Sequence, residues 1–118
     1  MQCNGPAMRD KKVLIIDDEV DFGLLMKAFF SKKGCNVFVA TSITTGLRLL
    51  QQEKPDYLLL DNNLPDGLGW SKADFILMNY PLTQLILISA LEVPKTSSST
   101  FRILHKPLLK DELNSIFK

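Results

Sequence analysis

Five side chains capable of polar or ionic chemistry follow or end short apolar runs in this chain of 118 residues. Asp17 and Asp18 come after the first run, and Asp61 comes after the third. Ser89 ends the fourth run, and Lys106 lies just beyond the fifth. In an open parallel sheet, ligands bind beyond the carboxyl ends of the strands. If these runs are strands of such a sheet, we expect the five side chains to meet at one edge.

The chemistry of these groups points to phosphoryl transfer beside a metal ion. Carboxylates that share a crevice repel each other unless a cation compensates their charge. Ligands that offer only oxygen favour a hard cation, and a small, incomplete set suits Mg²⁺, which keeps several waters. An aspartate such as Asp61 can attack phosphorus and form an acyl phosphate. Lys106 can balance the developing charge, and the Ser89 hydroxyl can donate to a phosphoryl oxygen.

Two alternating patterns predict the elements that position these residues. Between the apolar runs, apolar residues recur with helical spacing, as from Phe22 to Phe30. Strands without polar alternation are buried on both faces, which is typical of a parallel sheet covered by helices. The sequence therefore predicts a doubly wound α/β domain of five strands. We expect strands at 13–16, 37–40, 57–60, 85–88 and 103–104, and helices around 22–30, 43–50, 71–79 and 111–117.

Composition narrows the classes of function. An apolar fraction of 46% and a charged fraction of 23% are ordinary for a soluble globular protein. A net charge of +1 gives no long-range field, so we expect neither nucleic acid nor membrane as a direct partner. Cys3 and Cys35 form no CxxC pair, and no signal peptide is visible, so we expect a cytoplasmic protein. Residues 1–10 are expected to be an N-terminal tail, disordered or added for expression, and residues 11–118 the domain.

Five short motifs occur in the order, and nearly at the spacing, of a known family. They are residues 13–19 (VLIIDDE), 55–61 (PDYLLLD), 64–67 (LPDG), 87–90 (LISA) and 106–107 (KP). Through these motifs the chain resembles, from about residue 11 to residue 117, the receiver domain of two-component response regulators. The resemblance implies a flavodoxin-like fold, with strand order 2-1-3-4-5 and helices on both faces of the sheet.

The resemblance also implies a role for each site residue. Asp61 becomes the phosphoacceptor, Ser89 the switch hydroxyl and Lys106 the phosphate-contacting lysine, joined to Pro107 by a cis bond. The implied Mg²⁺ ligands are Asp17, Asp18, Asp61 and the backbone carbonyl of Asn63. The implied phosphoryl donor is a sensor histidine kinase or phosphotransfer protein. The domain would be a signalling switch rather than an enzyme, with only self-catalysed phosphoryl transfer and autodephosphorylation.

Two departures from the family pattern bear on how a signal is passed on. The segment from Ser89 to Lys106 is several residues shorter than usual, so we expect the fourth helix of the fold to be shortened or missing, with residues 92–100 in its place. Ile103 stands where the family usually has an aromatic switch residue. We expect the phosphorylation chemistry to be intact, and the two departures concern how its effect is passed on.

Other interpretations remain open at this stage. Asp17 and Asp18 could simply end a strand in a turn, and Ser89 could satisfy a loop amide. A receiver that is not phosphorylated and serves as an interaction module is the main alternative function. A magnesium-dependent phosphatase is a third, but its usual Asp-x-Asp motif is absent because Asn63 stands two residues after Asp61.

Overall fold

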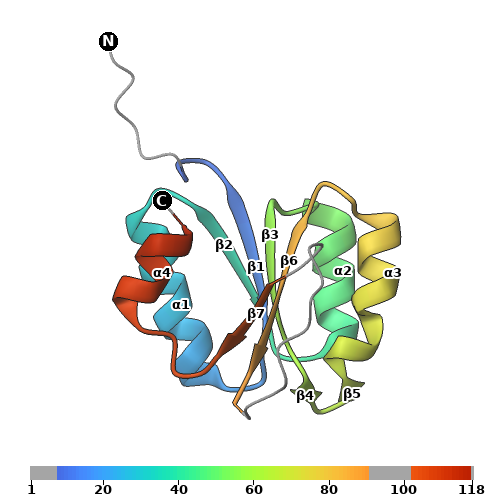
Figure 1. The fold of residues 1–118 in the computed structure, drawn as a ribbon. Coiled ribbons are helices and arrows are strands. Elements are labelled where there is room, and N and C mark those ends of the chain that lie inside the picture. The colour runs from blue at the N-terminus through green and yellow to red at the C-terminus, as the bar shows by residue number, and fades with distance from the viewer. Residues whose placement is uncertain (1–7, 91–101, 118) are drawn as a thin grey trace.

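Five parallel strands form the central sheet of the computed structural model, which describes residues 8–90 and 102–117 (Figure 1). The strands are β1 (Lys12–Ile16), β2 (Asn36–Ala40), β3 (Tyr57–Asp61), β6 (Gln84–Ser89) and β7 (Arg102–His105). Their order is β2-β1-β3-β6-β7, and each neighbouring pair runs parallel. With β6 and β7 as the fourth and fifth strands of the sheet, this is the predicted order 2-1-3-4-5. The predicted doubly wound α/β fold is confirmed.

The strand β1 shows why these segments lack polar alternation. Val13 and Ile15 belong to one core cluster, whereas Leu14 and Ile16 belong to a second cluster. All four side chains are buried. Since helices cover both faces of the sheet, successive residues of a strand must be apolar on both sides.

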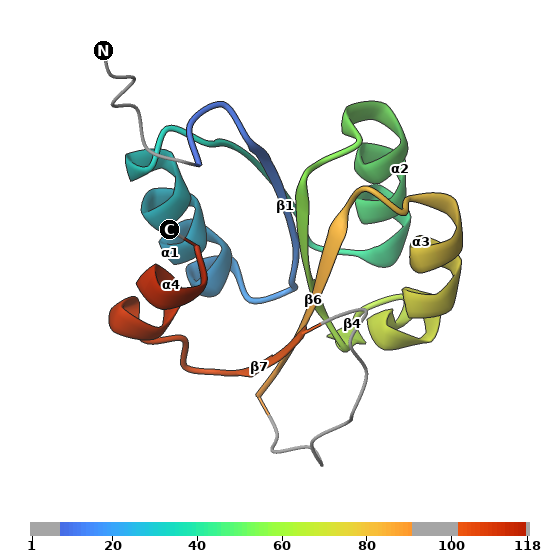
Figure 2. The ribbon, with the colours of Figure 1, turned by 45° about the horizontal axis from the view of Figure 1, so that its top comes forward.

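Helices lie on both faces of the sheet (Figure 2). α1 (Val20–Lys32) and α4 (Lys110–Ile116) pack on one face, and α2 (Ile43–Glu53) and α3 (Ala73–Asn79) pack on the other. These are the four segments whose apolar spacing predicts helices. In the described part of the chain, no helix is long and apolar enough to cross a membrane.

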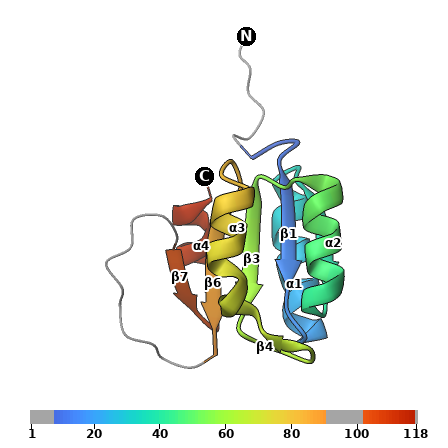
Figure 3. The same ribbon diagram turned by 90° about the vertical axis from the view of Figure 1, so that its right-hand side faces the viewer.

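A short hairpin that the sequence analysis does not predict follows β3 at the carboxyl edge of the sheet (Figure 3). This region contains β4 (Asn63–Leu64), β5 (Gly67–Leu68) and the 3-10 helix η1 (Gly69–Lys72), which continues into α3. Asp66, between β4 and β5, accepts hydrogen bonds from the backbone N–H groups of Ile43 and Thr44, at 2.8 and 2.9 Å. These donors belong to the first turn of α2, so the hairpin caps that helix.

The N-terminal boundary of the domain differs from the predicted one. Met8, placed in the tail by the sequence analysis, is only 3% exposed and belongs to a core cluster. Its carbonyl accepts a hydrogen bond from Cys35 Sγ at 3.3 Å, and Asp10 N donates to Gly34 O at 2.9 Å. Because residues 8–10 make these contacts, they belong to the folded domain rather than to a disordered tail.

The segment between β6 and β7 is where the sequence predicts a shortened or missing helix. Residues 92–100 lie outside the described residues. Ile103, at the position of the expected aromatic switch, lies on β7 and is half-buried against the core.

Candidate functional site

The three predicted aspartates converge at the carboxyl edge of the sheet. Asp17 and Asp18 directly follow β1, and Asp61 is the last residue of β3. β1 and β3 are neighbouring parallel strands, with Ile16 opposite Leu60, so both strands end at the same edge. One carboxylate oxygen from each aspartate lies within 4.8 Å of the others. The structure thus brings together acids from two separate strands.

Burial makes two of the carboxylates, those of Asp17 and Asp61, resist ionisation. Asp17 is fully buried and Asp61 is 6% exposed, whereas Asp18 is exposed. Burial, together with the negative charge of Asp17, raises the pKa of Asp61 to about 6. Burial also raises the pKa of Asp17, although its contact with Lys106 opposes this rise. The free energy of such a cluster falls when a cation binds among the carboxylates.

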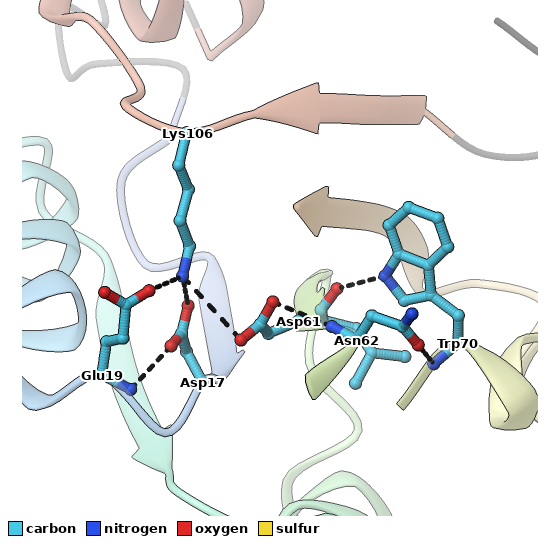
Figure 4. Close-up of polar contacts among 7 residues, drawn as sticks. Asp17, Glu19, Asp61, Asn62, Trp70 and Lys106 are labelled. Carbon is cyan, nitrogen blue, oxygen red and sulfur yellow. Dashed lines mark hydrogen bonds and ion pairs between the residues drawn. The ribbon is translucent and has the colours of Figure 1, made fainter. Parts of the chain in front are cut away.

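Lys106 brings an ammonium group to the cluster from the loop after β7 (Figure 4). Its Nζ lies 2.6 Å from Asp17 Oδ2 and 3.8 Å from Asp61 Oδ2, and it also contacts Glu19 Oε1. Burial lowers the pKa of Lys106, but its close contacts with the carboxylates of Asp17 and Glu19 outweigh burial, and the pKa is raised. The Lys106–Pro107 bond is cis, as the family resemblance implies. Lys106 is therefore held as a cation beside the aspartates.

Ser89 lies near this cluster in the central sheet, and Asn63 lies near it in the chain. Ser89 is the last residue of β6 and is buried, and its carbonyl accepts a hydrogen bond from Lys106 N at 2.8 Å. The preceding residue, Ile88, is opposite Asp61 in the strand register. Asn63 begins β4, two residues after Asp61, and its side chain is exposed. Both predicted residues thus lie at the carboxyl edge.

The profile of the response regulator receiver domain matches residues 13–118. The chain belongs to this family. One curated relative is the transcriptional regulatory protein YxdJ of Bacillus subtilis, 35% identical over 81 residues, which are 67% of this chain and 34% of the relative. Another is sporulation initiation phosphotransferase F of the same organism, 35% identical over 63 residues, or 52% of this chain and 51% of the relative. The chain thus spans about a third to a half of the length of these two relatives.

Solved receiver structures share the fold at lower sequence identity. A CheY-like receiver domain protein from Methanospirillum hungatei superposes with a TM-score of 0.80 at 23% identity, covering 91% of this chain and 90% of that one. A two-component response regulator from Clostridium difficile gives a TM-score of 0.81 at 24% identity, covering 91% and 92%. The receiver fold predicted from the motifs is therefore confirmed.

The loop after Asp61 in this receiver domain has contacts that the sequence analysis missed. Asn62 N donates to Asp61 Oδ1 at 2.9 Å, and Asn62 Oδ1 accepts from Trp70 N at 3.2 Å. The Trp70 indole N–H donates to the carbonyl of Leu60 at 3.2 Å, so Trp70 holds this loop by hydrogen bonds as well as by packing (Figure 4). A side chain at Gly69 would place its Cβ 2.1 Å from the Asp61 carbonyl oxygen. In the sequence, this close approach is signalled only by Gly69 itself, the second glycine of GLGW.

Glu19 also has contacts that were not predicted from the sequence. It belongs to the first motif, but the sequence analysis gives it no role. Its side chain contacts the Lys106 ammonium, and its backbone N–H donates to Asp17 Oδ1 at 2.8 Å. The available sequence signal is the third acid that directly follows the pair Asp17 and Asp18.

The donor set fits a small, hard cation. Asp17 Oδ2 is buried and accepts no aligned hydrogen bond, since its contact with Lys106 Nζ is an ion pair only. Oxygens of Asp18 and Asp61 lie within 4.8 Å of an Asp17 oxygen, so carboxylates from three residues can share one ion. Receiver domains are generally Mg²⁺-dependent, and this oxygen-only cluster agrees with that requirement.

Proposed function

We propose that this receiver domain accepts a phosphoryl group on Asp61 in a Mg²⁺-dependent phosphorelay and acts as a signalling switch. The observation that carries the proposal is the meeting of three aspartates from two strands with the ammonium of Lys106. This arrangement places negative oxygen ligands and a fixed positive charge around one carboxylate.

Asp61 has the environment that a nucleophilic carboxylate needs. Its Oδ1 accepts a hydrogen bond from Asn62 N, which fixes the rotation of the carboxylate. Its Oδ2 lies on the side of Lys106. In the proposed reaction, an Asp61 oxygen forms a bond to phosphorus while the bond from phosphorus to the donor atom breaks. The product is an acyl phosphate on Asp61.

Two charges would balance the phosphoryl group. Mg²⁺, held by Asp17, Asp18, Asp61 and the Asn63 carbonyl, would neutralise the phosphoryl oxygens and the surrounding carboxylates. Lys106 would bind a phosphoryl oxygen from the other side, where its ammonium can offset the negative charge. Ser89 would donate its hydroxyl hydrogen to a further phosphoryl oxygen.

The phosphoryl donor follows from the family. Receiver domains interact with sensor kinases or phosphotransfer proteins, and we propose a sensor histidine kinase or a phosphotransfer protein as the donor here.

Such a relay would operate in the cytoplasm. With a net charge of +1, the domain has no charge that favours direct binding to nucleic acid or anionic membranes.

Intact-mass measurement tests the proposal. Wild-type protein incubated with acetyl phosphate and Mg²⁺ should gain the mass of one phosphoryl group, and chelation of Mg²⁺ should prevent the gain. Asp61→Asn should gain none, whereas Asp56→Asn, at the amino end of β3, should behave as wild type. An adduct that persists in Asp61→Asn would contradict the assignment. Absence of any adduct would favour the alternative of a non-phosphorylated interaction module.

A further inference from the structure

The ammonium of Lys106 has a second set of contacts on the side of α1. Besides Asp17, it contacts Glu19 Oε1 and lies 4.5 Å from the centre of the Phe22 ring. Its distance to Asp61 Oδ2 is longer, at 3.8 Å. A cation over an aromatic face is attracted to the ring, so Phe22 adds to the attraction of the two acids. The ammonium is therefore held mainly on the α1 side of the cluster (Figure 4).

The backbone of Glu19 is fixed while its side chain remains accessible. Glu19 precedes α1, its N–H donates to Asp17 Oδ1 at 2.8 Å, and its carbonyl accepts from Gly23 N at 3.1 Å. The side chain itself is 58% exposed, whereas the Lys106 side chain is 10% exposed. Glu19 can therefore release the ammonium into water at little cost, in contrast to the buried Asp17.

From this geometry we propose that Glu19 is a positioning residue for Lys106, which holds the ammonium in a resting position away from Asp61. Glu19 then competes with a phosphoryl group on Asp61 for the same cation. The inference rests on the proposed phosphoryl acceptance by Asp61. Phosphorylation would draw Lys106 off Glu19 and off the Phe22 ring, so that the ion pair opposes phosphorylation and favours the unmodified domain.

The exposure of the Glu19 side chain sets the expected size of its effect on phosphoryl binding. An ion pair with one exposed partner changes an equilibrium by a few-fold, because water screens the charges. Removing the Glu19 charge should therefore tighten the binding of an anionic phosphoryl mimic about threefold. The direction of the change in affinity distinguishes this role from a simple alignment of Lys106. A residue that merely aligned Lys106 for the phosphoryl group would weaken binding when it is removed.

Beryllofluoride binding at saturating Mg²⁺ measures this competition, with Trp70 fluorescence as the signal. Glu19→Gln should lower the dissociation constant about threefold relative to wild type. Asp21→Asn is the matched control, because it removes one exposed charge from the first turn of α1. It should leave the dissociation constant unchanged. Equal changes in both variants, no change in Glu19→Gln, or weaker binding would each overturn the proposal.

A double-mutant cycle shows whether Glu19 acts through Lys106. In a Lys106→Met background, Glu19→Gln should have no effect on the dissociation constant. An undiminished threefold effect there would overturn the proposal. If wild-type protein binds no beryllofluoride, the proposed function fails and the inference falls with it. If wild type binds and Glu19→Gln matches it, only the inference fails.

Proton and carbon NMR of the Lys106 Cε group provides a signature that a purely structural role would not produce. The Phe22 ring should shield the Cε protons in the free protein, since the neighbouring Nζ lies near the ring. Beryllofluoride should remove this shielding, and Glu19→Gln should reduce it even without the mimic. Unchanged Lys106 shifts in Glu19→Gln would refute a resting position that depends on Glu19.

Discussion

The crowding of carboxylates predicts that replacing the proposed phosphoacceptor makes the fold more stable. Asp61 is nearly fully buried next to Asp17, and its pKa is raised from 3.8 to about 6. Asn has almost the shape of a protonated Asp but cannot ionise. Asp61→Asn should therefore increase the free energy of unfolding at neutral pH in the absence of divalent metal.

The size and pH dependence follow from the shift in pKa. A rise from 3.8 to about 6 costs the folded state about 3 kcal/mol at neutral pH, at about 1.4 kcal/mol per tenfold change in proton affinity. Below pH 3.8, Asp61 is protonated in both folded and unfolded chains, so the penalty vanishes. Between pH 3.8 and about 6 only the unfolded chain ionises readily, so wild-type stability falls as pH rises.

Denaturant unfolding of wild type and Asp61→Asn between pH 3.5 and 8, with chelator present, measures this difference. We expect a gain of about 2–3 kcal/mol for the variant above pH 6, or roughly 10–20 °C in melting temperature. The gain should disappear near pH 3.5. Saturating Mg²⁺ should reduce it, because the ion stabilises the wild-type carboxylates.

The same substitution at an exposed site provides the control. Asp10 is exposed and has a φ of 65°, a conformation that Asn also accepts, so Asp10→Asn should change stability by less than about 0.5 kcal/mol. If Asp61→Asn destabilises the domain at neutral pH, or gives a gain that is independent of pH, the electrostatic account of the cluster is wrong.

Substitutions at three positions test the contacts around the loop after Asp61 by denaturant or thermal unfolding. Trp70→Phe keeps the ring but loses the N–H bond to Leu60, and should cost about 1 kcal/mol; no loss would mean that the bond is not formed in solution. Gly69→Ala should cost about 2 kcal/mol or more, because its Cβ would collide with the Asp61 carbonyl oxygen, and wild-type stability would refute that approach. Asp66→Ala removes two capping hydrogen bonds from the first turn of α2 and should lower the melting temperature more than Asp66→Asn does; equal effects would contradict capping by Asp66.

The fold was predictable wherever burial requires apolar residues at regular positions in the sequence. Runs such as residues 13–16 are apolar because helices cover both faces of the sheet, so continuous hydrophobicity identified the strands of the central sheet. The site was predictable because polar residues directly follow those runs. Parallel strands bring such residues to one edge whatever the details of the loops.

Other features leave no regular pattern. β4 and β5 have two residues each, too few to show alternation, so the hairpin that holds Asp66 against α2 was not expected. Met8 joins the core as a single apolar residue in a polar stretch, which no periodicity distinguishes from a tail. The contacts of Glu19 and Trp70 depend on side-chain directions at the site, and residue spacing does not determine those directions.

A crystal structure with Mg²⁺ and beryllofluoride bound would test the proposed phosphoryl site most directly. We expect beryllium bonded to an Asp61 carboxylate oxygen, with Mg²⁺ about 2.1 Å from oxygens contributed by Asp17 and Asp61. We also expect the Lys106 ammonium to lie on a fluoride rather than on Glu19. Beryllofluoride on a different carboxylate, or Mg²⁺ bound away from these aspartates, would contradict the proposed role of Asp61.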